Sequence, residues 1–224
     1  MTAAPTLWPF LPVLLRGAAV TLEVTAASGC IAFILAILVG TARVSRVAAV
    51  RGLATAYTEI LRGTSALIQL FYFFFILPAL GIDTTPMEAA ALGLGLTFSA
   101  YGAEIVRASI LGVDNGQWDA ARALGMPNGL AFRRIILPQA FGTMLAPFGN
   151  LLVELLKSTS LVSLITLTDL TFSGAQVITS TGRPGQTWGA VLILYFLMCF
   201  PLAQAVRSLE RGFTVYRGPA RRPA

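Results

Sequence analysis

Five stretches of the chain are apolar over a length sufficient to cross a lipid bilayer. A helix needs about 20 residues to cross the roughly 30 Å of hydrocarbon. The stretches are residues 18–42, 63–82, 89–113, 135–153 and 184–206. We expect the fourth to continue past Glu154 and Lys157. Because these stretches carry very few charges, the pattern predicts an all-α integral membrane protein with five transmembrane helices.

The two ends of the chain have a different pattern. Residues 1–17 contain three prolines, which are unfavourable inside a helix, so we expect an interfacial segment anchored by Trp8. This segment lacks the basic start of a cleaved signal peptide, so we expect it to stay on the chain. Residues 18–211 then form the transmembrane domain, and residues 212–224 form a basic cytoplasmic tail.

Composition agrees with a membrane protein. Of 224 residues, 56% are hydrophobic and 12% are charged, and that charged share is about half of the value typical of soluble domains. The chain has no histidine, which removes the commonest general base and transition-metal ligand. These figures argue against a secreted mini-protein, a nucleic-acid-binding domain and a disordered chain.

The positions of the arginines predict how the chain is oriented. With five spans, eleven arginines fall in loops on one side of the membrane and two on the other. Because cytoplasmic loops carry the excess of basic residues, this distribution predicts an outside N-terminus and a cytoplasmic C-terminus. The net charge of +6 is therefore interpreted as a topology signal and not as a sign of nucleic-acid binding.

The predicted cytoplasmic loop at residues 112–138 is long and polar, yet its sequence favours short helices. Residues 117–124 are good helix formers, and Gly125 is suited to end that helix. A second helical stretch at 130–137 is expected to close at Pro138 before the next span.

Two interpretations of this loop are open on physical grounds. In one, a short helix lies outside the membrane, and small Ala120 and Ala121 allow another protein to approach closely. In the other, an amphipathic loop rests on lipid headgroups. The spacing of residues within the loop bears on which of these two interpretations applies.

A motif in this loop resembles that of a known family. Asp119-Ala120-Ala121, Gly125, Ile135 and Leu137-Pro138 keep every spacing of the "EAA" loop found in permease subunits of binding-protein-dependent ABC importers. Asp119 stands where the family usually has glutamate, so the carboxylate is one methylene shorter. Further stretches are similar to the polar amino acid branch of that family. They are Arg62–Thr64, Ala103–Arg107, Gly116–Trp118 and Leu156–Leu161.

The resemblance implies a fold like that of methionine permeases, in the inner membrane of a bacterium. It implies that the 112–138 loop is a coupling helix seated on a cytoplasmic ATPase, with Gly116 among its residues. The implied partners are a second permease subunit (identical or paralogous), two ATPase subunits and an extracytoplasmic solute-binding protein. ATP would be bound by the ATPase subunits, and the chain would hold no cofactor of its own. Residues 149–157 and 162–167 are most similar to permeases for ectoine-type compatible solutes.

Charged and polar residues inside the spans are candidates for a solute path, because ionisable groups are costly in hydrocarbon. Asn150, Glu154 and Lys157 fall at helical spacing along one face of the fourth span. Two interpretations are open: a face that lines the path of a zwitterionic solute, or a Glu154–Lys157 ion pair that fixes helix packing.

Two other spans carry polar candidates. Glu104 and Arg107 are three residues apart, which favours a local ion pair, although Glu104 is also a candidate for an inner gate. Gln69 is the strongly polar residue deep in the second span, where interhelical hydrogen bonding is favoured over solute contact.

Other classes of function are less favoured. A self-contained ion-coupled secondary transporter or channel is the main alternative, but we find no convincing inverted repeat. A membrane enzyme would need a catalytic group arrangement that the sequence does not suggest. The chain also lacks the Gly-x4-Gly-Lys-Ser/Thr phosphate loop, so we expect a partner to hydrolyse ATP.

Overall fold

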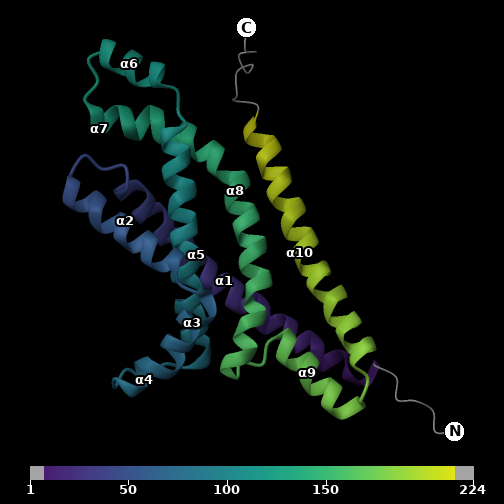
Figure 1. The fold of residues 1–224 in the computed structure, drawn as a ribbon. Helices are drawn as coiled ribbons and strands as arrows, with labels where there is room; N and C mark the ends of the chain where they lie inside the picture. The colour runs from purple at the N-terminus through teal and green to yellow at the C-terminus, as the bar shows by residue number, and fades with distance from the viewer. Residues whose placement is uncertain (1–7, 215–224) are drawn as a thin grey trace, which may run out of the picture.

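The structure of this protein is a computed structural model that describes residues 8–214, with side chains for residues 9–208. Every regular element in this range is a helix (Figure 1), which confirms the all-α prediction. Four helices are long and apolar enough to cross a membrane, and a bent helix pair gives a fifth candidate span. The start of α1 and the end of α10 lie at opposite ends of the molecule. Which end faces the cytoplasm stays a prediction.

The helix α1 (Leu11–Ala42) is longer than the first predicted span. It begins seven residues before residue 18, because Pro12 lies in its first turn, where no intrahelical N–H bond is lost. A three-residue 3₁₀ turn (Trp8–Phe10) precedes it. Residues 1–7, which make up much of the predicted interfacial segment, lie outside the described residues, as do residues 215–224 of the predicted tail.

The central helix is α5 (Pro86–Leu111), the most buried of the candidate spans. It packs along α1 through small residues: a Cβ added to Gly40 of α1 would lie 2.7 Å from the Ala103 carbonyl oxygen, and one added to Gly102 would lie 2.7 Å from Ala36 Cβ. These approaches are closer than any side chain permits. The two helix backbones therefore meet directly, as small residues allow in membrane helices.

The second predicted span, residues 63–82, is not one straight helix. The structure has α2 (Ala48–Gly63), α3 (Ala66–Phe71), a π-helical turn η2 (Tyr72–Ile76) and α4 (Leu77–Ala79), with a bend of 100° after Gly63. Thr64 and Ser65 are extended at the bend, so the hydrogen-bond ladder stops there. The bend lies at the first residues of the predicted span, and α2 before it carries the charged Glu59 and Arg62.

The fourth span also differs in detail from the prediction. Pro138 does not close a helix: α7 (Asn128–Ala131) passes through a π-helical turn η3 (Phe132–Ile136) directly into α8 (Leu137–Ser158). The Leu137 N–H bonds to the Phe132 carbonyl, five residues back. The helix thus widens just before the proline, which has no N–H to give. The same arrangement precedes Pro78, after the turn η2.

Two helices were not predicted, α2 in the loop between the first two predicted spans and α9. After a 3₁₀ segment η4 (Thr159–Ile165), α9 (Leu170–Thr181) runs between α8 and α10 (Pro184–Thr214). Its sequence signals are local: Asp169 caps the start by accepting from the Thr171 and Phe172 N–H groups, and Gly182 ends it with φ of 66°. At twelve residues, α9 is too short to register as a span.

Candidate functional site

The 112–138 loop projects from one end of the bundle as two stacked helical segments (Figure 1). Its first segment is α6 (Asn115–Ala123), and the Asp114 side chain caps it by accepting from the Gly116 N–H at 2.7 Å. Gly125 has φ of 70°, a conformation that glycine adopts at low cost after a helix. The loop therefore has a defined helical structure.

Side chains inside the loop hold the two segments together. The Trp118 ring of α6 stacks on the Phe132 ring of the following segment, with 6.5 Å between ring centroids. Ala121 is fully buried, and Ile135 packs on the same apolar cluster as Trp118 and Phe132. Within this cluster, buried Ile136 joins the loop to Val106 and Ile110 at the end of α5. The loop is therefore packed against the end of a candidate span.

The opposite face of α6 is open. Ala120 is exposed, and Asp119 forms an exposed ion pair with Arg122 at 3.0 Å. Leu124 is 77% exposed, more than any other large apolar side chain in the described range. At the start of α8, Leu137 is half-buried and Pro138 is exposed. A single exposed leucine does not by itself mark a binding surface, so the contact of this face with an ATPase stays a prediction.

The structure places Asn150, Glu154 and Lys157 together on an exposed face of α8. Among the described side chains, Glu154 and Lys157 form no ion pair with each other or with any other residue. One of the two interpretations of these residues, a structural ion pair, is therefore not seen among the described side chains. Both residues are exposed on the isolated subunit, and Lys157 lies near enough to Cys199 of α10 to interact with it electrostatically.

Glu104 is the centre of a larger cluster than its sequence suggests. Arg107 Nη1 donates to Glu104 Oε1 at 2.8 Å, as the i, i+3 spacing predicts. Two further arginines reach the other carboxylate oxygen: Arg43 donates to it in a close hydrogen bond, and Arg62 Nη1 lies 3.8 Å away. Arg43 also lies 3.8 Å from Glu59.

The sequence reasoning missed Arg43 and Arg62 because they belong to other elements. Arg43 follows α1 and Arg62 lies at the end of α2, so the carboxylate joins three helices. The Arg62 guanidinium also lies over the Tyr101 ring, 5.5 Å from its centroid. The Arg43 side chain is 8% exposed, which makes Glu104 its main compensating charge.

Gln69 is buried at the bend between α2 and α3. Its side-chain N–H group donates to the Leu61 carbonyl at 2.8 Å and to the Thr64 hydroxyl at 2.7 Å, and its oxygen accepts from the Thr97 hydroxyl of α5 at 2.7 Å. It therefore satisfies a carbonyl freed by the broken helix and ties both halves to α5. Both polar atoms of the Gln69 side chain thus bond within the subunit, and neither is directed toward a solute.

A second buried acid was not anticipated. Asp169, at the start of α9 and outside the candidate spans, is fully buried and accepts hydrogen bonds from two backbone N–H groups and the Tyr195 hydroxyl. Burial raises the pKa of this carboxyl above its ordinary value, and the hydrogen bonds oppose that rise. The cap signal before α9 could have identified this residue as structural.

Comparison with known proteins agrees with this arrangement. A protein-family profile described as "Binding-protein-dependent transport system inner membrane component" matches residues 32–214. A relative from Sinorhizobium fredii, "Probable amino-acid ABC transporter permease protein y4tF", is 41% identical over 212 residues, which cover 92% of this chain and 89% of that protein.

Two solved structures have the same fold. One is the crystal structure of an amino acid ABC transporter with histidines, with a TM-score of 0.87 and 30% identity over 92% of this chain and 96% of that chain. The other is an inward-facing conformation of the MetNI methionine ABC transporter, with a TM-score of 0.80 and 22% identity over 92% and 98%. The predicted methionine-permease-like fold is thus confirmed.

The matched region covers most of the chain and includes every candidate residue named above, from Gln69 to Lys157. Together with the apolar helices, the match identifies a multi-pass protein of the inner membrane. The chain belongs to the family of inner membrane components of binding-protein-dependent transport systems, as the residue spacing in the 112–138 loop predicted.

Proposed function

We propose that this chain is the permease subunit of an ATP-driven importer for an amino acid or an amino-acid derivative. That the chain is a permease subunit follows from its family, and the descriptions of the Sinorhizobium fredii relative and of the 30% identical structure as amino acid ABC transporters support an amino-acid substrate. Within that class we propose a small zwitterion, and the similarity of residues 149–157 to ectoine-type permeases favours a compatible solute such as ectoine.

The observation that carries the proposal is the polar face of α8. Glu154 and Lys157 carry opposite charges on an exposed face of a candidate span, and neither forms an ion pair with a side chain in residues 9–208. Charged groups at this depth face water or protein and not lipid. A second permease subunit that covers this face would enclose a path with one negative and one positive group, which suits a zwitterion.

In this proposal ATP hydrolysis reaches the path through α6. Two cytoplasmic ATPase subunits would bind ATP and grip the open face around Ala120 and Leu124, and the chain would bind no cofactor. Movement of α6 would pass through Trp118 and Ile136 to the end of α5. An extracytoplasmic binding protein would deliver the solute at the other end.

Site-directed crosslinking tests the ATPase contact. Ala121 is unsuitable because it is buried, so cysteine is placed at the exposed Ala120 (Ala120→Cys), with exposed Gly52→Cys on α2 as the matched control. We expect a crosslink to the ATPase from position 120 and none from position 52. An active complex in which position 120 never contacts the ATPase would reject the coupling assignment.

A second test concerns the path. Glu154→Gln should lower ATP-driven uptake by about tenfold or more, equivalent to roughly 1.4 kcal/mol in the rate-limiting step, while the complex assembles normally. The control is Glu23→Gln, which neutralises an exposed carboxylate on α1. Unchanged uptake in the Glu154 variant would contradict a role for this residue in the path.

The substrate class is tested on the reconstituted importer with its binding protein. Uptake of labelled glutamine and of labelled ectoine is measured in separate vesicle preparations. Each uptake is measured with and without an excess of the other compound in unlabelled form. The proposal expects one of these zwitterions to be transported and a neutral sugar of similar size to be excluded. Transport of ectoine in preference to glutamine would support the narrower assignment, and the reverse preference would reject it.

A further inference from the structure

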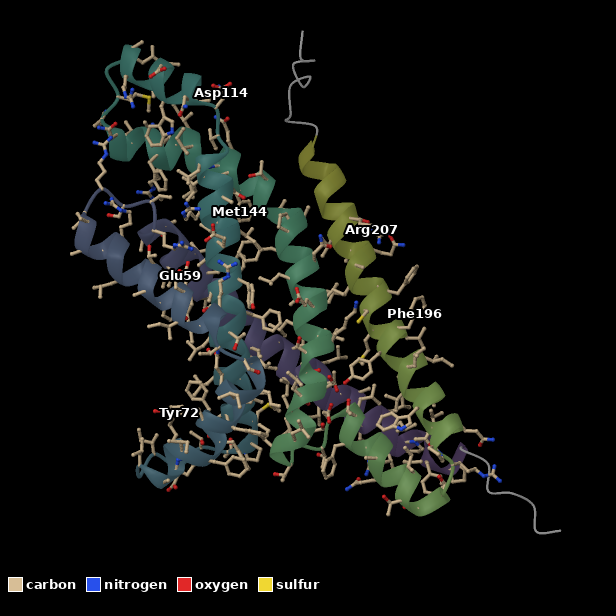
Figure 2. All side chains as sticks on the ribbon, in the orientation of Figure 1. Glu59, Tyr72, Asp114, Met144, Phe196 and Arg207 are labelled. Carbon is tan, nitrogen blue, oxygen red and sulfur yellow. The ribbon has the colours of Figure 1, made fainter. Side chains whose placement is uncertain are left out.

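The segment that joins α8 to α9 has an unusual backbone conformation. Its first part, η4, is a run of seven residues in the 3₁₀ conformation, whereas runs longer than three or four residues are uncommon. Thr166 follows with φ of 63°, and it is the one non-glycine residue with a positive φ in the described part of the chain. This conformation is strained for a β-branched side chain. The segment lies at the end of the molecule opposite to Asp114 and the 112–138 loop (Figure 2).

Packing against the core favours the 3₁₀ form of η4. Thr159, Val162 and Ile165 are fully buried, and they are spaced three residues apart. Because a 3₁₀ helix has three residues per turn, these side chains lie on one face. Val162 and Ile165 belong to an apolar cluster that includes Leu70 of α3 and Leu94 of α5. In an α-helix, with 3.6 residues per turn, Ile165 would turn about 120° away from Thr159.

The α-helical form is available to the same residues. Residues 159–166 contain neither glycine nor proline, so α8 can continue through them without a break. In that form Thr166 would have a negative φ, and its strain would be relieved. The segment therefore has two arrangements, one favoured by side-chain packing and the other by the backbone, as a two-state element requires.

The helix that follows the segment is held in place by α1 and α10. The Leu170 N–H donates to the Thr21 hydroxyl of α1 at 3.1 Å, and the Asp169 carboxylate accepts from the Tyr195 hydroxyl of α10 at 3.4 Å. A Cβ added to Gly17 of α1 would lie 2.8 Å from the Asp169 carbonyl oxygen, so the start of α9 lies directly on α1. A change in the length of η4 would therefore move α8 and not α9.

We propose that residues 159–166 are a hinge that changes from a 3₁₀ to an α-helical form during the transport cycle. A 3₁₀ helix rises about 2.0 Å per residue and an α-helix about 1.5 Å, so the change would shorten the seven residues by about 3.5 Å. The helix α8 would slide toward α9 by that distance and carry Glu154 and Lys157 with it. This inference rests on the proposed function, because a transport cycle requires two states of the permease.

Distances between spin labels test the hinge in proteoliposomes that contain the chain with its ATPase and binding protein. Labels are attached at Gln139→Cys in α8 and Thr179→Cys in α9, both exposed positions, after Cys30 and Cys199 are replaced by alanine. Labelled chain is diluted with unlabelled chain, so that the distance is measured within one subunit. We expect this distance to differ by about 3 Å between the ATP-free and the ATP-bound complex. A control pair, Ala19→Cys on α1 with Thr179→Cys, should keep its distance.

A pair of point variants tests whether the strained residue controls this movement. Asparagine tolerates a positive φ better than threonine does. Thr166→Asn should therefore stabilise the 3₁₀ form by about fivefold, which is about 1 kcal/mol, and lower the population of the α-helical form by the same factor. Thr168→Asn is the matched control, because Thr168 is exposed and lacks a positive φ, and it should leave the populations unchanged.

The outcomes separate the hinge from the proposed function. An unchanged distance between the labels on α8 and α9, in a complex that imports solute with ATP, would overturn the hinge and leave the proposed function standing. A full shift in the Thr166→Asn variant would also overturn the hinge, because the movement would then not depend on the strained residue. Absence of ATP-driven uptake by the wild-type complex would overturn the proposed function and the hinge together.

Discussion

Replacing Glu104 by glutamine removes the one carboxylate that Arg43, Arg62 and Arg107 share. The amide keeps the size of the side chain and can still accept a hydrogen bond, so the change isolates the charge. Three guanidinium groups then face one another with only Glu59, 3.8 Å from Arg43, to compensate. The variant should fold into the same helices but with a lower free energy of unfolding.

The size of the effect depends on how exposed each partner is. Arg43 is 8% exposed, so its hydrogen bond to Glu104 is worth about 1.5–3 kcal/mol as a charged bond away from water. Arg62 and Arg107 are 36% and 37% exposed, which limits each of their pairings to about 0.2–1 kcal/mol. Glu104→Gln should therefore lower the free energy of unfolding by about 2–5 kcal/mol.

The assay is thermal unfolding of the purified chain in one detergent at low and high salt. For a chain of this length the loss corresponds to a fall in Tm of roughly 4–20 °C. The control is Asp119→Asn, which breaks the exposed Asp119–Arg122 pair and should change Tm by about 2 °C or less. Equal small shifts in the two variants would refute the reasoning that Glu104 joins α1, α2 and α5. If Arg107→Gln lowered Tm as much as Glu104→Gln does, that result would also refute the assignment of most of the lost free energy to the Arg43–Glu104 hydrogen bond.

Three further predictions follow from the geometry. Gly40→Ala should lower the free energy of unfolding by about 1–3 kcal/mol, since the new methyl group would lie 2.7 Å from a backbone oxygen of α5, whereas Gly52→Ala, with no atom within 4 Å, should not destabilise the chain. Gly125→Ala forces an L residue to φ of 70° and should cost about 1–2 kcal/mol, seen as roughly 5–30-fold faster hydrogen exchange in α6. Because the pKa of Asp169 is raised in the folded chain, its contribution to stability is present below the unfolded pKa of about 3.9 and is lost as pH rises through the folded pKa. Thermal unfolding between pH 3 and 7 should show this loss in the wild type and not in Asp169→Asn, and identical profiles would contradict it.

The long apolar runs made most of the fold predictable. Residues 89–113 and 184–206 correspond to α5 and α10, because a helix is the only structure that satisfies its backbone in lipid without closing a barrel. The loop helix α6 was predictable for a different reason. Its start at Asp114 and its end at Gly125 carry local cap and turn chemistry that a sequence displays directly.

What the sequence did not reveal depends on contacts between distant residues. Arg43 reaches Glu104 across 61 positions, and no periodicity within one helix indicates such a pair. The bend after Gly63 is supported by Gln69 and Thr97, which lie on different helices. For Glu154 and Lys157 the sequence left two interpretations open. Their spacing allows an ion pair, but the two exposed side chains form none with each other in the described part of the chain.

The most direct test of the proposed function is uptake into proteoliposomes that contain this chain with its ATPase and binding protein. We predict that uptake of an amino acid or a related zwitterion requires ATP, the ATPase and the binding protein together. Omission of the ATPase should abolish it, whatever ion gradient is imposed. Uptake by this chain alone, driven by a proton or sodium gradient, would contradict the assignment as an importer subunit.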